Sequence, residues 1–322
     1  MNQPNKNNVI GRPYHQIIYV NMKNSNLLVT AALFLAICTQ TVSAAEIKAV
    51  RNGSKIDVTI DDRFFTSYIF SIEEKYPFFF PVNGPTTGGS VTSMRNGEYP
   101  HHSSLFFTCD KVNGGNYWQE GLERGQIVSG GAKIVEQGVR VVIADECTWK
   151  RPGVDSPVKD MRRITITAPS KNLWQIDFEI TLEPLIDVEV LKSNHSLFCA
   201  RVATDICVVN GGVMVNAEGA SGETATDGTP SAWMDYHGKR GNTIEGIAIM
   251  QHPSNIAYPA PWETRDYGFI SPTHMDYLPD NVQSVNFRKG EKITLRYRVL
   301  VHAGDHKTAD IAGEFEKYRA YK

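Results

Sequence analysis

The chain has 322 residues, of which 41% are hydrophobic, and its 33 basic and 35 acidic side chains give a formal net charge of −2. A chain this close to neutrality, without a cluster of Lys or Arg, has no bulk electrostatic attraction for nucleic acids or anionic membranes. Its size and apolar content instead indicate a globular protein with a substantial core, and nucleic acid is excluded as an expected partner.

Residues 1–45 have the pattern of a secretory signal peptide. They contain no Asp or Glu, and Lys23 precedes an apolar run, Leu27–Cys38, that is followed by a polar stretch ending in Ser43-Ala44-Ala45. The apolar run is too short to cross a bilayer as a helix, which takes about 20 residues, and the small residues at the end suit a signal peptidase. We therefore expect cleavage after Ala44 or Ala45, and no transmembrane span in the mature chain.

Met22 is expected to be the true start, because residues 1–21 precede a complete signal peptide and read as an upstream extension. The mature chain, residues 46–322, is expected to be exported, either to the periplasm or outside the cell. Leu35-Ala36-Ile37-Cys38 resembles a lipid-attachment box. Ile37 is bulkier than the residue usual before the cysteine, however, so a lipoprotein is disfavoured.

Four cysteines remain after this processing: Cys109, Cys147, Cys199 and Cys207. An oxidising compartment permits disulfides, but a domain of this size can fold without them. Four buried thiols and a Cys199–Cys207 pair therefore both stay open. No CxxC or Cys/His spacing indicates a structural zinc site.

Short alternating or β-branched runs, separated by turn residues, predict many strands in residues 46–322. In Trp174–Leu182 every second side chain is apolar, which is typical of an antiparallel strand with one face on the core. The predicted strands are Lys55–Ile60, Phe64–Phe70, Val139–Ala144, Arg163–Ala168, Trp174–Leu182, Asp187–Leu191, Leu197–Ala203, Val213–Asn216, Thr243–Met250, Val282–Phe287 and Ile293–His302.

One helix is predicted near the C-terminus, from Lys307 to Tyr318, with Asp305 near its start and Ile311 and Phe315 in its apolar stripe. No βαβ alternation, internal repeat or linker divides residues 46–322, which we expect to form a single domain. So many strands in one domain favour two packed antiparallel sheets, because one open sheet would expose an apolar face or long edges. We predict an all-β protein, a large antiparallel β-sandwich with a C-terminal helix.

The segment Arg95–Trp118 gathers polar side chains that are costly to desolvate unless they bind or react with something. His101 and His102 are adjacent, so both reach one pocket only where Pro100 holds them on a loop or bulge. His102 is predicted to act as an acid or base. The alternatives are one packed and one solvated histidine, or metal ligation with further ligands such as His252.

Two acids are candidates for the carboxylate partner of His102. Glu218 lies just past the predicted strand Val213–Asn216, in the small, polar loop 217–230, and Asp235 lies between two aromatic residues. Loops of this composition often border a pocket. Either acid can instead be a solvated surface residue, and Glu218 is a further candidate for a metal ligand.

The prolines of residues 259–267 predict a rigid loop rather than a strand. Within it, Trp262 can stack on the apolar face of a pyranose ring. Arg265 can hold a carboxylate or hydroxyls with its fixed fork of donors. The alternatives are a core tryptophan at 262 and a structural salt bridge between Arg265 and Asp266.

These segments supply the residues of the candidate site. The catalytic candidates are His102, Glu218, Asp235 and His252. The expected substrate contacts are Arg95, His101, Asn113, Trp118, Arg201, Trp233, Asn255, Trp262, Arg265 and Tyr267. No cofactor is predicted, and a divalent metal ion is left open.

Seven motifs are spread over nearly the whole mature chain: Tyr76–Pro81, Tyr99–Phe107, Val112–Gly114 with Trp118, Ala232–Tyr236, His252–Asn255, Pro261–Trp262 and Arg265–Gly268. Together they resemble the PmoA-like family, a domain of unknown function (DUF6807). Members of that family look like exported bacterial proteins of polysaccharide-utilisation loci. The resemblance therefore implies carbohydrate chemistry and a galactose-mutarotase-like supersandwich.

The reaction class follows from the residue types. Hydrolysis of a glycosidic bond usually uses two carboxylates about 5 to 9 Å apart, whereas a lyase or epimerase abstracts a proton, which suits a histidine with an arginine or second acid. We predict an exported carbohydrate-active enzyme with a carbohydrate ligand, which cleaves a glycoside by hydrolysis or elimination. A mutarotase-like sugar epimerase, a non-catalytic carbohydrate-binding protein and a structural protein are the alternatives.

Overall fold

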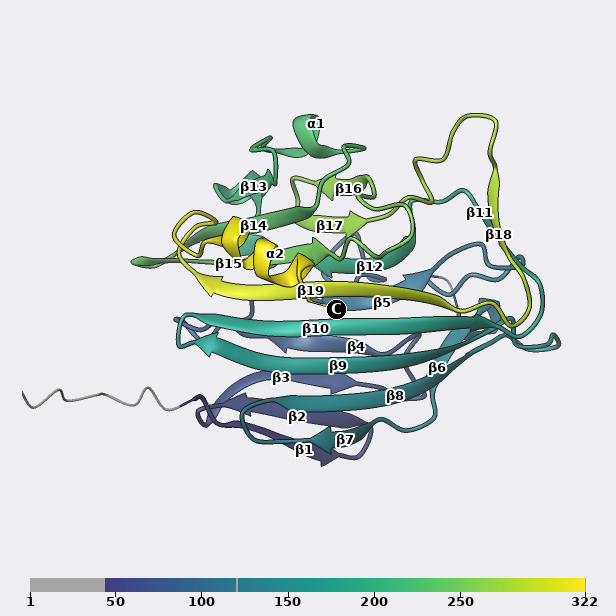
Figure 1. The fold of residues 1–322 in the computed structure, drawn as a ribbon, viewed down its shortest axis with the longest axis horizontal. Coiled ribbons are helices and arrows are strands. Elements are labelled where there is room, and N and C mark those ends of the chain that lie inside the picture. The colour runs from purple at the N-terminus through teal and green to yellow at the C-terminus, as the bar shows by residue number, and fades with distance from the viewer. Residues whose placement is uncertain (1–43, 120, 322) are drawn as a thin grey trace, which may run out of the picture. The chain divides into compact units, whose positions relative to one another are not determined.

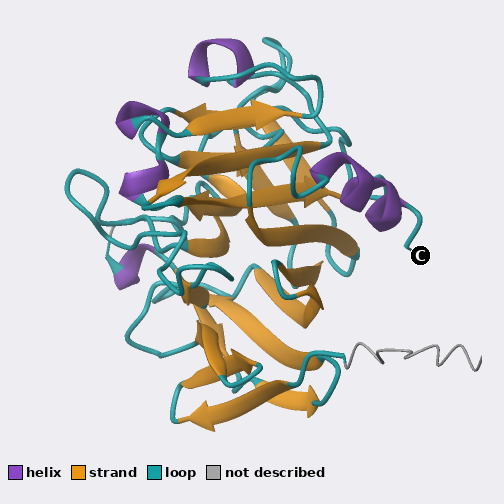
Figure 2. Ribbon diagram, turned by 90° about the vertical axis from the view of Figure 1, so that its left-hand side faces the viewer, coloured by secondary structure: helices purple, strands orange, loops and turns teal. Residues whose placement is uncertain are grey.

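The computed structural model describes residues 44–119 and 121–321. Two large antiparallel β-sheets make up most of this part of the chain, and its few helices lie at the periphery (Figures 1 and 2). The all-β class and the packed antiparallel sheets confirm the predicted fold. The predicted upstream extension and signal peptide fall, apart from Ala44 and Ala45, outside the described residues.

The first sheet has eight strands in the spatial order β1-β2-β3-β4-β5-β12-β17-β16. Short turns join β1 to β2 and β2 to β3, a longer segment connects β4 to β5, and β12, β17 and β16 come from the second half of the chain. The bounds are β1 (Ile47–Asn52), β2 (Lys55–Ile60), β3 (Arg63–Ile69), β4 (Phe78–Val82), β5 (Leu105–Cys109), β12 (Ser196–Arg201), β17 (Phe269–Pro272) and β16 (Trp262–Arg265).

The second sheet has nine strands, in the order β13-β14-β15-β19-β10-β9-β8-β6, and β7 also pairs with β8. A separate two-stranded sheet joins β11 to β18. The bounds are β6 (Gln126–Ser129), β7 (Lys133–Glu136), β8 (Val141–Lys150), β9 (Val158–Ser170), β10 (Leu173–Pro184), β11 (Val188–Leu191), β13 (Val213–Asn216), β14 (Trp233–Arg240), β15 (Thr243–Gln251), β18 (Ser284–Phe287) and β19 (Ile293–Ala303).

Aromatic side chains fill the space between the two large sheets. The ring of Phe178 on β10 lies 6.5 Å from that of Phe79, 6.1 Å from Phe107 and 4.9 Å from Phe198, all on the facing sheet. Because side chains alternate along a strand, the neighbours of these residues point to the outer faces of the sandwich. Each outer face therefore presents side chains that do not belong to the core between the two sheets.

The C-terminal helix α2 (Ile311–Arg319) covers part of the outer face of the nine-stranded sheet, beside β15 and β19 (Figure 1). Ile311, Phe315 and Tyr318 on this helix pack in a second apolar cluster with Trp233 and Leu300 of the sheet. This docking confirms the helix expected at the C-terminus. The remaining helix, α1 (Glu223–Thr226), is one turn long, and three 3-10 turns span Leu122–Arg124, Thr204–Ile206 and Val208–Asn210.

Every predicted strand is present, and the differences have local causes. The helix begins later than predicted because Asp310 caps it by accepting from the Gly313 N–H at 3.2 Å, whereas Asp305 accepts from Thr308 N in the preceding turn. Residues 259–267 are not wholly a loop, since β16 begins directly after Pro261. The strand escaped prediction because Pro259 and Pro261, which indicate a loop, lie directly before it; both fall outside the residues that pair with β17, so the strand can form.

The four cysteines of the described residues are all buried and free. The structure therefore forms no Cys199–Cys207 disulfide, and the alternative of buried thiols holds. No helix among the described residues is long and apolar enough to cross a membrane.

Candidate active site on the outer face of the eight-stranded sheet

Strand register gathers charged side chains on the outer face of the eight-stranded sheet. Arg201 of β12 pairs with Phe269 of β17, which in turn pairs with Arg265 of β16. Glu263, two residues before Arg265, pairs with Ser271. Because directly paired residues of antiparallel strands share a face, these side chains lie on one surface. Their neighbours Ala200 of β12 and Ile270 of β17 point the other way, into the core.

The loop before β5 places two histidines over this surface. The His102 ring lies between Tyr99, with centroids 5.1 Å apart and planes 6° apart, and Phe269, at 4.6 Å and 23°. His101 meets His102 edge to face at 4.4 Å. The His102 side chain is buried, and this burial lowers its pKa to about 2, so its ring stays neutral. Both histidines therefore lie over the surface that carries Arg201, Glu263 and Arg265. These side chains together are called the cluster below.

A third histidine joins the cluster from the connection before β12. The His195 ring stacks on Trp118, with centroids 5.1 Å apart, and its centroid lies 5.9 Å from that of His101. Its Nδ1 is 3.7 Å from Oδ2 of the buried Asp110. Burial lowers the pKa of His101, and the neighbouring His195 lowers it further. His101 is thus suited to accept a proton at neutral pH.

Glu263 is a buried carboxyl group with unusual acidity. Only 4% of the residue is exposed, and Oε1 accepts from Asn194 at 3.0 Å and lies 3.2 Å from the Arg265 guanidinium. Burial raises the pKa of Glu263 to about 7, although Arg265, Asn194 and the nearby His195 partly offset this rise. A carboxyl group with this pKa can hold and release a proton near neutrality.

Arg201 is the buried cation of the site. Its guanidinium carbon lies 4.5 Å from the ring centroid of Tyr267 and 5.2 Å from that of Tyr99, and these two rings stack at 4.4 Å. Burial lowers its pKa, against the opposing effect of Cys207 and the tyrosines. The two tyrosine rings thus stabilise the Arg201 guanidinium, because attraction to the ring quadrupole replaces part of the hydration that the guanidinium loses on burial.

Unpartnered buried polar atoms concentrate here. Among the described residues, eleven buried side-chain nitrogen or oxygen atoms have no hydrogen-bond partner, and five of them belong to this cluster: His102 Nδ1, Trp118 Nε1, Arg201 Nε and Nη1, and Glu263 Oε2. Such an atom typically costs about 1–3 kcal/mol when left unpaired. Native proteins tolerate few of them, so their accumulation in one place indicates groups that serve a ligand.

An open cavity of about 570 Å³ borders the cluster. His101 and Trp118 line it together with Tyr76, Arg95 and Glu74, and the last two form an ion pair. Cavities of roughly 300 to 1,000 Å³ suit small-molecule ligands. The cluster therefore has both reactive groups and room for a ligand beside them.

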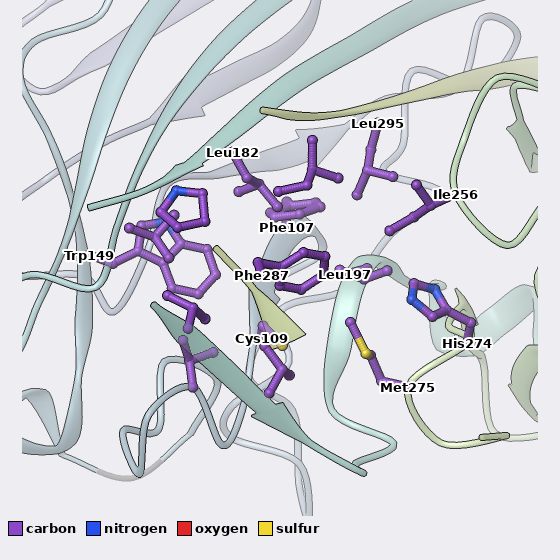
Figure 3. A pocket seen from close by; sticks show the side chains of 16 residues that line it. Phe107, Cys109, Trp149, Leu182, Leu197, Ile256, His274, Met275, Phe287 and Leu295 are labelled. Carbon is purple, nitrogen blue, oxygen red and sulfur yellow. The ribbon is translucent and has the colours of Figure 1, made fainter. Parts of the chain in front are cut away.

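A second cavity lies in the apolar core (Figure 3). It measures about 40 Å³, and aromatic and aliphatic side chains such as Phe107, Leu182 and Leu295 surround it, with His274 at one side. Burial lowers the pKa of His274, so that ring stays neutral. A space this small and apolar is a packing defect between the sheets rather than a sugar site.

The structure brings together half of the residues predicted for the site. Seven of the fourteen candidates lie in or beside the cluster: Arg95, His101, His102, Trp118, Arg201, Arg265 and Tyr267. Both histidines lie on the loop before β5, but His101 lines the open cavity, whereas His102 stacks between Tyr99 and Phe269.

The predicted carboxylate partners of His102 lie elsewhere. Asp235 is fully buried on the outer face of the nine-stranded sheet, where it contacts His237 and His302. Glu218 is exposed in the turn after β13. The acid of the cluster is Glu263 instead, because strand register rather than sequence proximity brings it near His195.

The other predicted residues have structural partners. Both nitrogens of His252 lie within hydrogen-bond distance of Ser254 and Tyr321 oxygens, and the Asn255 amide bonds both backbone groups of Arg296. The Asn113 side chain bonds the backbone of Asp187 and Glu189. Trp262 is buried and donates to the Ser231 carbonyl at 2.8 Å, and Trp233 packs under α2. These contacts describe structural roles.

Sequence reasoning missed Tyr99, Asp110, His195, Glu263 and Phe269. The signal for Glu263 was weak, because Trp262 is the one strongly apolar residue of the four in β16 and the prolines before it indicate a loop. His195 had no such signal, because only the β5 and β12 pairing brings it beside Trp118.

The comparisons with known proteins give a family but no activity. The model of a family of unknown function (DUF6807) matches residues 55–316. No curated protein matches the chain in sequence. Among solved structures, it is similar to a candidate kojibiose phosphorylase from the human microbiome, with 8% identity, a TM-score of 0.34, and coverage of 85% of this chain and 33% of that one.

Two further solved structures are similar over 81% of this chain. One is a GalM/aldose epimerase homologue from C. elegans, with 9% identity, a TM-score of 0.32 and 99% of that chain covered. The other is a polysaccharide lyase, with 13% identity, a TM-score of 0.29 and 33% of that chain covered. The chain thus spans about a third of the length of the phosphorylase and of the lyase. Similarities this low carry no argument about activity.

Proposed function

Because the chain belongs to this family of unknown function, its activity has to follow from its site, and we propose that it is an exported carbohydrate-active enzyme whose acid is Glu263. The observation that carries the proposal is the buried Glu263 carboxyl, which has a pKa of about 7 and lies near His195, in a cluster whose His101 and Trp118 line a cavity of about 570 Å³. The export pattern and the PmoA-like motifs of the sequence support the same class.

The chemistry around the cavity suits a sugar. Sugars present hydroxyl groups at their edges and apolar C–H faces, so they need both hydrogen-bonding groups and aromatic surfaces. The unpartnered nitrogens of Arg201, Trp118 and His102 supply donors or acceptors, and Glu263 Oε2 supplies a further position. Tyr76 and Trp118 supply aromatic surface at the cavity.

Proton transfer between a carboxyl group and a histidine is the reaction type that this arrangement favours. A protonated Glu263 can donate to a leaving or ring oxygen, while His101, whose pKa burial lowers, can accept a proton from carbon or from a hydroxyl. Asp110 lies beside His195 Nδ1 and can orient that ring. Arg201 can stabilise negative charge that develops on the substrate.

This assignment favours elimination or isomerisation over hydrolysis by two carboxylates. Both favoured reactions need one acid and one base on a single sugar, which Glu263 and the histidines provide. Glycoside hydrolysis usually pairs two carboxylates across the bond, whereas the nearby titratable base of Glu263 is a histidine, His195. A non-catalytic carbohydrate-binding protein is the second candidate, because the unpartnered donors and aromatic surfaces would serve binding alone.

The test is to incubate the purified protein with a panel of plant and host glycans and 3-keto-glycosides. Three readouts separate the reactions: new reducing ends for hydrolysis, ultraviolet absorbance for unsaturated products, and exchange of anomeric signals in nuclear magnetic resonance for isomerisation. We expect turnover that falls at least about 100-fold in Glu263→Gln, the usual size of a lost general acid. Glu189→Gln, which alters an exposed carboxylate on β11, should keep full activity.

Two results would count against the assignment. Turnover that survives in Glu263→Gln but is lost in Glu218→Gln would assign the role of the acid to Glu218, in the turn after β13. Binding of one glycan without any turnover, unchanged in Glu263→Gln, would make the protein a carbohydrate-binding module. Loss of that binding in Arg201→Met would then place the ligand at the same cluster.

A further inference from the structure

A second cluster of titratable side chains lies on the outer face of the nine-stranded sheet. Asp235 and His237 occupy positions i and i+2 of β14, so both point to this face. His302 comes from the end of β19 and His306 from the turn that leads into α2. Asp235 Oδ1 is 2.5 Å from His237 Nδ1, and Oδ2 is 2.7 Å from His302 Nε2.

A glycine on the strand between them makes room for these rings. Gly246 of β15 pairs with His237 on one side and with His302 on the other. A Cβ at this position would lie 2.7 Å from His237 Cβ, 2.7 Å from His302 Cε1 and 2.6 Å from the Tyr236 carbonyl oxygen. Those distances are shorter than van der Waals contact allows, so the two rings can converge only over a glycine.

The ligand atoms of three residues lie as close as a bound ion requires. One ligating atom each from Asp235, His237 and His306 lies within 4.8 Å of the other two. Asp235 is fully buried and His237 is 6% exposed, so water does not screen them.

His306 is the residue that a hydrogen-bond network alone does not explain. Asp235 already has a partner for each carboxylate oxygen, so it has no need of a third histidine. The His306 Nδ1 atom is nevertheless buried, has no hydrogen-bond partner among the described residues, and lies on a ring 5.4 Å from that of His237. Leaving such a nitrogen unpaired is unfavourable unless it serves as a ligand.

We propose that Asp235, His237 and His306 bind a divalent transition-metal ion, with zinc as the ion that this ligand set fits. Imidazole nitrogens with one carboxylate oxygen are typical zinc ligands, and three of them leave a fourth position for water or another group. His302 would orient Asp235 from the second carboxylate oxygen, while its other nitrogen faces the Gly304 carbonyl at 3.1 Å. The ion would link β14 to the turn that begins α2.

This site is separate from the proposed active site. The ligands lie on the outer face of one sheet, whereas Glu263 and the histidines His101, His102 and His195 lie on the outer face of the other. The ion is therefore proposed to hold the start of α2 against the sheet, and it takes no part in proton transfer at Glu263.

Zinc titration of the untagged full chain, stripped with a chelator, tests the proposal. Isothermal titration calorimetry and elemental analysis should give one tightly bound zinc per chain. We expect His306→Ala and the milder His306→Gln to weaken binding at least about 100-fold, since each removes a ligand, and His302→Ala to weaken it about 10- to 100-fold. His252→Ala, which removes a histidine bonded to Tyr321, is the matched control and should bind zinc like the wild type.

The His101→Ala/His195→Ala double variant distinguishes the two histidine clusters. Zinc binding that survives in this variant and is lost in the His306 variants supports the proposal. Zinc binding that is lost in the double variant and kept in the His306 variants would move the ion to the active site, and wild-type protein without a tight zinc site would overturn the proposal. Cobalt spectroscopy of the wild type reports the ligand geometry should the His306 variants fold poorly.

Discussion

Replacing Glu263 by glutamine should change how the stability of the protein depends on pH. The carboxyl group has a pKa of about 7 in the folded chain, against about 4.5 when it is exposed. The folded state therefore binds this proton more tightly than the unfolded state. Folding stability then falls as pH rises above about 4.5, and the loss is complete once pH exceeds the folded pKa of about 7. Glutamine has no proton to lose, so the variant lacks this dependence.

The magnitude follows from the two pKa values. A tenfold change in a protonation equilibrium is worth about 1.4 kcal/mol, so the difference between about 4.5 and about 7 amounts to about 3 kcal/mol above pH 8. Part of that cost is already present at pH 5, because the unfolded carboxyl is ionised there. Between pH 5 and pH 8.5 the stability of Glu263→Gln relative to wild type should therefore rise by about 2 to 3 kcal/mol.

Urea denaturation at a series of pH values between 5 and 8.5 measures this difference directly. Each comparison is made between two proteins at one pH, so the titration of His102 and other shared groups cancels. A constant offset from altered hydrogen bonds to Asn194 and Arg265 would also leave the pH dependence unaffected. The stability of Glu189→Gln relative to wild type should not change with pH. The reasoning is refuted if the difference for Glu263→Gln is likewise independent of pH.

Three further predictions concern packing and charge. His102 has a pKa of about 2 because it is buried, so folding loses stability as pH falls below about 6.5, and His102→Phe should gain about 2 kcal/mol over wild type on going from pH 8 to pH 5, measured by urea denaturation. Gly246→Ala should destabilise by about 1–3 kcal/mol, because the added Cβ overlaps His237 and His302, whereas Gly53→Ala, with open space around it, reports only backbone strain. Phe178→Ala should cost about 3–5 kcal/mol, since its ring joins the two sheets; a loss near 1 kcal/mol would mean that the interface rearranges.

The sequence predicted the fold class because the long strands alternate. In Trp174–Leu182, half of the side chains must face the core, and that period identifies the strand without any tertiary information. Several of the missed strands lack this alternation. All five residues of β5 (Leu105–Cys109) are buried, so no alternation is visible, and β6 and β7 are only four residues long. Their existence depends on the partners that pair with them.

The site was predicted only in part because its residues meet through strand pairing. His101, His102 and Trp118 lie close in sequence, and their density of polar and aromatic groups was visible. Glu263 and His195 come from segments far along the chain, and only the order β5-β12-β17-β16 sets them beside the histidines. A single sequence does not contain this strand order. The chosen acids, Glu218 and Asp235, were therefore reasonable in type but wrongly paired with His102.

The pKa of Glu263 depends on how many acidic side chains the Arg265 guanidinium contacts. The Arg265 guanidinium lies 2.6 Å from Asp227 and 3.9 Å from Glu223, as well as 3.2 Å from Glu263. A cation devoted to one buried carboxylate would hold that group ionised, well below a pKa of 7. Divided among three acids, with the partly exposed Asp227 at the shortest distance, it offsets only part of the desolvation of Glu263. The carboxyl group can then keep its proton near neutral pH, which is what a general acid needs.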